Sequence, residues 1–202
     1  MKKIVFNDRY GLTQAVIEGR KTMTRRIEFD DELQKMVTDS DSYYYDDGYL
    51  VFATLGVDIH HVKTRYKVGE EVAVAQSYSS LYDETADDYL GYEKEPGWKN
   101  KMFVKSELMP HRILITGVRC ERLQDISDAD CMKSGVTEHY VSEDTFAYSF
   151  PGLDGFYLGG GFPQPKEDAI RKVFALVIDK ISGKGSWERN PWVVVYEFEL
   201  VK

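Results

Sequence analysis

The chain has 202 residues, of which 43% are hydrophobic and 13% aromatic, and its formal net charge is −8. This length and composition are typical of a globular protein with a buried core and exclude a largely disordered chain. The negative field of such a protein repels polyanions at long range, which argues against a protein that coats nucleic acid nonspecifically. A small basic pocket for one nucleotide or a few phosphates is still compatible with the charge.

The sequence predicts a cytoplasmic protein without a membrane partner. It has no apolar run of about eighteen residues, and its first residues, "MKKIVF", lack the apolar core of a secretory signal. The two cysteines, Cys120 and Cys131, form neither a CxxC metal pair nor a disulfide framework. We therefore expect no metal and no cofactor.

The first 26 residues are expected to form a strand, a helix and a cationic turn. "KIVF" (3–6) is typical of a short strand, and Asn7 or Asp8 is a candidate helix cap. Leu12, Ala15 and Val16 follow at helical spacing, and Gly19 is placed to end the helix. The cationic stretch "EGRKTMTRR" (18–26) thus begins where a helix ends.

Three segments are expected to be surface insertions, at about 28–48, 79–101 and 137–164. Residues 27–50 contain eight acids and one cation, Lys35. Residues 79–101 again combine acids with Gly and Pro, which favours a loop. Residues 137–164 are rich in Gly and aromatics and show no periodic core pattern, so "YLGGGF" is interpreted as a hinge or close-approach loop.

Strands and helices alternate irregularly in the remaining segments. Strands are predicted in "YLVFATL", "HHVKTRY", "YKVGEEVAVAQSY", "ILITGVRCERL" with a bend at Gly117, and "NPWVVVYEFELVK". A short helix is predicted between Ser127, which forms a capping box with Asp130, and Gly135. A longer helix opens at Pro165 and closes at Gly183. This order favours an α+β fold with a curled mixed sheet over a doubly wound fold.

The stretch "GRKTMTRR" is the candidate ligand site. In extended form, Lys21, Met23 and Arg25 share one face, and Thr22, Thr24 and Arg26 share the other. Hydroxyls beside a guanidinium can hold a phosphate or the polar edge of a base. The alternative from spacing alone is a solvated charged turn. Arg20 and Arg25 are interpreted as solvated neighbours of the site.

Four segments resemble, in their order, ASCH-domain proteins of the PUA-like superfamily, particularly the larger members of phages and prophages: "GRKTMTRR", "YKVGEEVAVAQSY", "MPHRILITGVRCERLQDIS" and "SWERNPWVVVYEFELV". The family pattern GxKxxExR is matched by Gly19, Lys21 and Arg26, with Thr24 where the acid usually stands. The resemblance implies a single domain, a small β-barrel flanked by helices, and a cleft for RNA or a modified nucleoside.

A branch of the same superfamily resembles small amidohydrolases that deacetylate acetylated cytidine with a Lys, a Thr and a Glu. Lys21 and Thr24 stand at the matching positions, and a Lys with a lowered pKa can accept the Thr proton so that the hydroxyl attacks an amide carbonyl. Ser134 stands near the position expected for the Glu, and Glu138 and Asp130 are nearby candidates for the missing carboxylate.

Other candidate ligand contacts are weaker. Gln76 on a strand could donate to and accept from a base edge. Trp187 and Trp192 could stack a base, although packing in the core is the commoner role of tryptophan. His60 and His61 alternate along a strand and so cannot bind one metal, and His111 is a cleft candidate without a mechanism.

Three hypotheses follow. The first is an RNA- or nucleoside-binding module that uses Gly19, Lys21, Thr24, Arg26, Gln76 and Ser134. The second is an amidohydrolase that acts on an acylated base through Lys21 and Thr24. The third is a phage or prophage accessory protein whose acidic insertions bind a protein partner.

Overall fold

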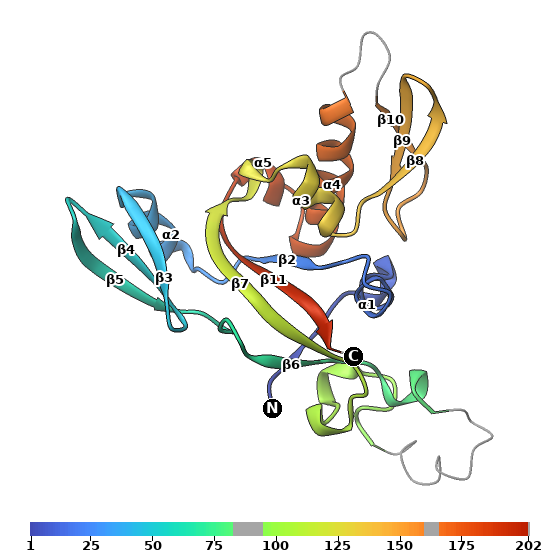
Figure 1. Cartoon of the computed structure of the whole chain (residues 1–202), viewed down its shortest axis with the longest axis horizontal. Helices are drawn as coiled ribbons and strands as arrows, with labels where there is room; N and C mark the ends of the chain where they lie inside the picture. The colour runs from blue at the N-terminus through green and yellow to red at the C-terminus, as the bar shows by residue number, and fades with distance from the viewer. Residues whose placement is uncertain (83–94, 160–165, 202) are drawn as a thin grey trace.

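The computed structural model describes residues 1–82, 95–159 and 166–201, and it is a mixed α+β structure (Figure 1). The strands are β1 (Lys3–Ile4), β2 (Met23–Arg26), β3 (Ser42–Asp46), β4 (Tyr49–Thr54), β5 (Val57–Lys63), β6 (Glu71–Val74), β7 (Arg112–Arg122), β8 (Thr137–Ser142), β9 (Thr145–Ser149), β10 (Tyr157–Gly159) and β11 (Trp192–Val201). The helices are α1 (Leu12–Ile17), α2 (Asp31–Thr38), α3 (Asp128–Lys133), α4 (Lys166–Ser182) and α5 (Ser186–Arg189). The predicted α+β class is confirmed.

The central sheet has the strand order β1-β6-β7-β11-β2. β1 pairs with β6 in parallel, whereas the other neighbours are antiparallel. The register between β7 and β11 shifts between Glu197 and Phe198, opposite Gly117, so the predicted bend lies where a bulge curves the sheet. Among the described strands, β1 and β2 are the two edges of this sheet.

Two small sheets extend from the central sheet, as Figure 1 shows. One has the order β3-β4-β5 and the other β10-β9-β8. Two of the three predicted insertions contain regular structure, since residues 28–48 include α2 and β3, and residues 137–164 include β8, β9 and β10. Residues 83–94 of the segment 79–101 and residues 160–162 of "YLGGGF" lie outside the described residues. The first half of "YLGGGF", Tyr157–Gly159, forms β10 and is not a loop. That these segments are insertions stays a prediction.

Local capping signals predicted the start of α3 and the end of α4 correctly. Ser127 Oγ accepts a hydrogen bond from the Asp130 main-chain N–H at the start of α3. α4 ends at Ser182, directly before Gly183, as predicted. The helix packs against β9, β10, α3 and α5, and its buried stripe consists of Ala169, Ile170, Val173, Phe174 and Val177. The predicted start at Pro165 lies outside the described residues.

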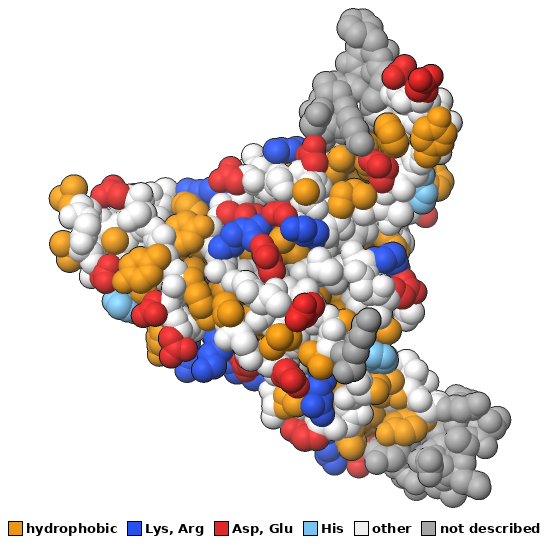
Figure 2. Space-filling view, viewed as in Figure 1, with side chains coloured by type: hydrophobic (Ala, Val, Ile, Leu, Met, Phe, Trp, Pro, Cys, Tyr) orange, Lys and Arg blue, Asp and Glu red, His pale blue; other side chains and the backbone are white. Residues whose placement is uncertain are grey.

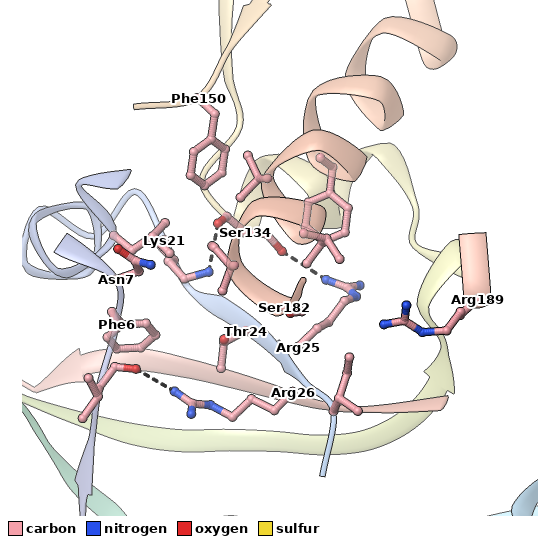
Figure 3. Close-up of a pocket in the computed structure, with 17 residues that line it drawn as sticks. Phe6, Asn7, Lys21, Thr24, Arg25, Arg26, Ser134, Phe150, Ser182 and Arg189 are labelled. Carbon is pink, nitrogen blue, oxygen red and sulfur yellow. Dashed lines mark hydrogen bonds between the residues drawn. The ribbon is translucent and has the colours of Figure 1, made fainter. Parts of the chain in front are cut away.

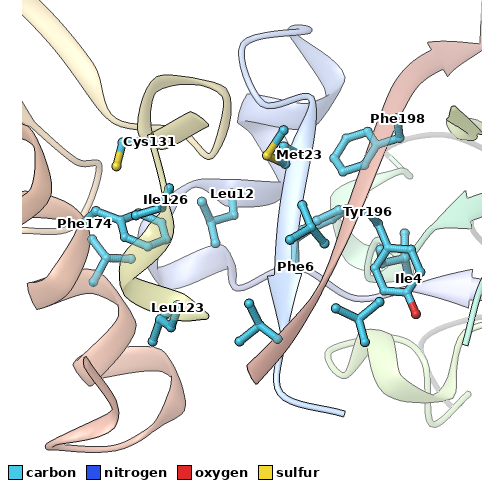
Figure 4. Packing of buried hydrophobic residues seen from close by; sticks show 14 of the residues in the cluster. Ile4, Phe6, Leu12, Met23, Leu123, Ile126, Cys131, Phe174, Tyr196 and Phe198 are labelled. Atoms are coloured by element: carbon cyan, nitrogen blue, oxygen red, sulfur yellow. The ribbon is translucent and has the colours of Figure 1, made fainter. Parts of the chain in front are cut away.

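The core lies between the central sheet and the helices α1, α3 and α4 (Figure 4). β11 contributes a continuous buried run, Val193–Tyr196, because both of its faces are covered. Cys120 and Cys131 are buried in this core as free thiols. Burial raises the pKa of each thiol to about 12, which keeps both protonated and unreactive.

The surface carries charge over the central strands and apolar side chains over the two small sheets. Figure 2 shows basic and acidic side chains interleaved at the centre of one face. Exposed apolar residues include Tyr44 and Leu55 on the β3–β5 sheet and Tyr140 and Leu158 on the β8–β10 sheet. In the described part of the chain, no helix is long and apolar enough to cross a membrane.

Candidate functional site

The turn after α1 directs Lys21 into the protein. Gly19 has a φ of 73°, a left-handed conformation that favours glycine, and its N–H bonds to Val16 O at 3.0 Å. The Lys21 N–H then bonds to Ala15 O at 2.9 Å, which closes the helix end. One residue further, the Thr22 N–H bonds to Lys133 O at 3.0 Å and ties the start of β2 to the end of α3.

A cavity of about 540 Å³, the Lys21 pocket, lies beside this turn (Figure 3). It is bounded by β2, by the turns after β1, α3 and β9, and by one side of α4. Its polar lining consists of Asn7, Lys21, Thr24, Arg25, Arg26, Ser134, Ser182 and Arg189. Its apolar lining consists of Val5, Phe6, Leu12, Ile27, Phe150, Phe174, Val177, Ile178 and Ile181. No acidic residue lines the pocket in the described part of the chain.

Lys21 is a buried cation of the pocket, with 4% of its surface exposed. Its Nζ donates to Met23 O at 2.6 Å and to Ser134 O at 2.8 Å, and the Phe6 ring centroid lies 5.9 Å away. Burial, assisted by the charges of Arg25 and Arg26, lowers the pKa of Lys21 to about 7. Near neutral pH the amine is thus divided between a charged form and a neutral form.

The two carbonyls define what Lys21 can still do. A protonated amine has three N–H donors, so one remains after both carbonyls are bonded. A neutral amine has two N–H donors, which both donate to the carbonyls, and it keeps a lone pair. Lys21 can therefore donate to an acceptor on a ligand when charged, or accept a proton when neutral.

Arg25 is not a solvated neighbour, and that interpretation was wrong. Only 1% of its side chain is exposed. Its Nε contacts Glu121 at 2.7 Å and its Nη2 contacts Asp130 at 3.0 Å, while Nη1 donates to Ser134 Oγ at 3.1 Å. Arg119 also contacts Asp130, at 2.6 Å. The two carboxylates thus compensate the charge of Arg25. Arg25 therefore has a structural role in the pocket wall.

Arg20 lies on the surface as predicted, with 44% of its side chain exposed and an ion pair to Glu18 at 2.5 Å.

Arg26 differs from Arg25 because no carboxylate forms an ion pair with it among the described residues. Its Nη2 donates to Val5 O at 3.0 Å. Its Nε is buried and has no hydrogen-bond partner in the same set of residues. Burial lowers the pKa of the guanidinium, and nearby Tyr66 and Glu28 oppose this effect. An arginine stays charged in proteins, so Arg26 brings to the pocket a cation that has no direct ion pair with a described carboxylate.

The structure brings together four of the six predicted ligand-binding residues, namely Lys21, Thr24, Arg26 and Ser134. Gly19 shapes the turn that places Lys21 but does not line the pocket. Gln76 lies beyond the end of β6, where its Oε1 is 2.7 Å from His111 Nδ1, and it does not line the pocket either. The strand prediction for Gln76 was wrong because β6 ends at Val74.

The two candidate carboxylates point elsewhere. Asp130 is bonded to Arg25 and Arg119, and Glu138 accepts a hydrogen bond from the Tyr148 hydroxyl at 2.8 Å. Lys21 itself is bonded to main-chain carbonyls. The described pocket thus has the Lys and the Thr of the predicted amidohydrolase without its acid.

The tryptophans and histidines do not contribute to the Lys21 pocket. Trp187 packs edge-on against Phe174 with ring centroids 6.1 Å apart, and Trp192 lies beneath the Arg122 guanidinium at 4.8 Å. Within the described residues, no group of three or more His, Cys, Asp or Glu side chains could hold a metal ion.

Sequence reasoning did not identify the aromatic wall of the pocket. Phe6, Phe150 and Phe174 come from three distant segments. Nothing in their local spacing distinguishes them from ordinary core residues. Arg189 belongs to the segment "SWERNPW", which is part of the resemblance to ASCH-domain proteins. That resemblance was the one sequence feature that could have indicated Arg189 as a site residue.

Comparison with protein-family models, with curated proteins and with solved structures finds no match to this chain.

Proposed function

We propose that the Lys21 pocket binds a nucleotide or a modified nucleoside, as a free ligand or as part of RNA. The observation that carries the proposal is a cavity that combines three phenylalanines with Lys21, Thr24, Arg26 and Arg189 and has no acid in its described lining. In a chain of net charge −8 this is a local reversal of charge. Such a pocket attracts an anionic or electron-rich ligand.

The two halves of the lining suit the two parts of a nucleotide. Aromatic and aliphatic side chains accept the apolar face of a base, and stacking of this kind tolerates any base. The Arg26 guanidinium and the Thr24 hydroxyl suit a phosphate or the polar edge of a base. A cavity of about 540 Å³ is in the usual range for a small-ligand site.

The resemblance to ASCH-domain proteins supports the same proposal. The residues that match the family pattern, Lys21 and Arg26, both line the pocket, and Gly19 forms the turn before them. A PUA-like barrel built on the curved central sheet is part of this proposal.

Ligand titrations of charge-matched variants test the proposal. Labelled RNA tetramers and the four nucleoside monophosphates are titrated into the parent, Arg26→Gln and Arg20→Gln at fixed salt. Arg26→Gln should weaken binding about tenfold, because it removes a guanidinium group of the pocket that no ion pair occupies. Arg20→Gln removes a surface charge of the same sign and should bind as the parent does. Equal affinity of Arg26→Gln and the parent would falsify the assignment of this site.

A second candidate function, an amidohydrolase, is favoured by one observation, the pKa of about 7 for Lys21 beside Thr24. Neutral Lys21 would accept the Thr24 proton while Oγ1 attacks the amide carbonyl of an acylated base. The amine of the base would leave with a proton, and water would then release the acyl group from Thr24. Incubation with acetylated cytidine tests this mechanism, since it requires acetate release by the parent and none by Thr24→Ala.

A further inference from the structure

A second cavity, of about 450 Å³, adjoins the Lys21 pocket and shares Arg189 with it. We call it the Arg122 pocket, and its lining includes Asp31, Lys35, Thr38, Asp39, Arg122 and Arg189. Its lining residues come from α2 and from the ends of β7 and α5. In Figure 3, Arg189 marks the end of the Lys21 pocket that lies opposite Lys21 and Asn7. The two cavities are therefore neighbours that have Arg189 in common.

Arg122 is held in place by neutral groups. Its Nη2 donates to Thr38 Oγ1 at 2.9 Å and its Nη1 to Asn190 O at 3.2 Å. The Trp192 ring lies 4.8 Å from its guanidinium carbon, so the planar group is supported from one side. No described carboxylate forms an ion pair with Arg122. The position of the guanidinium group is therefore fixed, and no direct ion pair with a described carboxylate occupies it.

Arg189 has the same character. Its Nη2 donates to Ser186 Oγ at 2.8 Å and its Nη1 to Lys184 O at 3.3 Å, and no ion pair is formed with a described carboxylate. Arg25 and Arg119 differ from Arg122 and Arg189, because each forms ion pairs with Glu121 and Asp130. Three guanidinium groups without an ion pair to a described carboxylate thus line the two neighbouring cavities, namely Arg26, Arg189 and Arg122.

We propose that the Arg122 pocket is a second subsite and that the ligand is a single-stranded oligonucleotide. This inference rests on the proposed function of the Lys21 pocket, which would hold one nucleoside of the strand. The backbone would then pass Arg189, and Arg122 with Lys35 would hold the next phosphate. Planar guanidinium groups suit this role because they offer paired donors to phosphate oxygens.

Two acids limit the length of strand that is bound. Asp31 and Asp39 also line the Arg122 pocket, so its three cations face two carboxylates. One phosphodiester can be held close to Arg122, whereas a longer polyanion meets repulsion at the rim. Removal of one of these acids should strengthen binding of the strand.

Arg122→Gln and Lys35→Gln are the informative variants. Each is titrated with a fluorescein-labelled RNA tetramer and with nucleoside monophosphates at several salt concentrations. Both substitutions should weaken tetramer binding about five- to tenfold, lower the salt slope by about one, and leave monophosphate binding unchanged. Asp39→Asn should tighten tetramer binding. Lys63→Gln removes an exposed charge on β5 and should change neither tetramer binding nor monophosphate binding. Lys35 is exposed and can be replaced without disturbing the packing that surrounds Arg122.

The outcomes separate the two proposals. Tetramer binding that is unchanged in both Arg122→Gln and Lys35→Gln, but weakened in Arg26→Gln, overturns the second subsite and leaves the Lys21 pocket in place. A parent that binds the tetramer no more tightly than a monophosphate overturns it as well. A parent that binds neither ligand overturns the proposed function and the subsite together.

Discussion

Lys21 Nζ donates a hydrogen bond to the main-chain oxygen of Ser134 over 2.8 Å, between residues 113 positions apart in the chain. This contact joins the turn after α1 to the end of α3, and it does so with an amine whose pKa is about 7. The stability of the fold and the charge of the pocket therefore depend on the same proton.

Replacement of Lys21 by methionine should make stability less dependent on pH. Lys21 is charged up to about pH 10.5 in the unfolded chain, but only up to about pH 7 in the folded protein. Between these values the unfolded state binds one more proton, so the parent gains stability as the pH rises. From about pH 7 to about pH 9 the parent should gain roughly 2 kcal/mol relative to Lys21→Met. Urea unfolding of both proteins at each pH measures this difference.

Lys63→Met, which removes an exposed ammonium from β5, is the control for the loss of a surface charge. A constant stability gap between the parent and Lys21→Met over this range would show that Lys21 keeps its proton in the folded state.

Binding of an RNA tetramer should weaken as the pH rises from about 6 to about 8. Lys21 loses its proton in this range and with it one positive charge of the pocket. The phosphodiesters of the tetramer do not titrate here, so a decrease of up to roughly tenfold would report on the protein. Fluorescence anisotropy at constant ionic strength measures it. Lys21→Met should bind weakly at both pH values, and a parent-like pH dependence in this variant would assign the effect to another group.

Capping signals and periodicity predicted much of the local structure. The stripe of α4 repeats over several turns, and Ser127 and Gly183 mark helix ends, because caps act through neighbouring main-chain groups. Gly117 indicated the bend of β7 because a residue without a side chain tolerates a bulge. These signals lie within a few residues of the structure they determine.

The β8–β10 sheet and the role of Arg25 could not be predicted in this way. β8 is largely exposed on both faces, so it lacks the alternation that a half-buried strand shows. Arg25 meets Glu121 and Asp130 across separations of 96 and 105 residues, which sequence spacing does not encode. The aromatic wall of the Lys21 pocket was missed for the same reason, since Phe6, Phe150 and Phe174 meet only in the folded chain.

Replacement of Asp130 by alanine should destabilise the protein by about 3 kcal/mol, because it leaves Arg25 with less of its compensating charge. The carboxylate is only 16% exposed and contacts both Arg25 and Arg119. Asp128→Ala, on the same helix turn, is a suitable comparison, since its ion pair with Arg171 at 3.5 Å is more exposed and should contribute less than about 1 kcal/mol. Chemical denaturation of the two variants measures both values. Similar losses in both would mean that the buried pair adds no more than an ordinary surface contact.

Replacement of Gly152 by alanine should cost more stability than the same change at Gly155. Both glycines have positive φ, 74° and 87°, so each substitution forces a left-handed alanine at about 1 kcal/mol. A Cβ on Gly152 would lie 2.2 Å from Arg9 O, whereas a Cβ on Gly155 would meet nothing within 4 Å. The main chain near Arg9 must move to relieve this overlap, so Gly152→Ala should lose about 3 kcal/mol in total. Thermal unfolding of the two variants separates the cost of the clash from that of the backbone conformation, and equal losses would show that η1 (Asp8–Tyr10) shifts without cost.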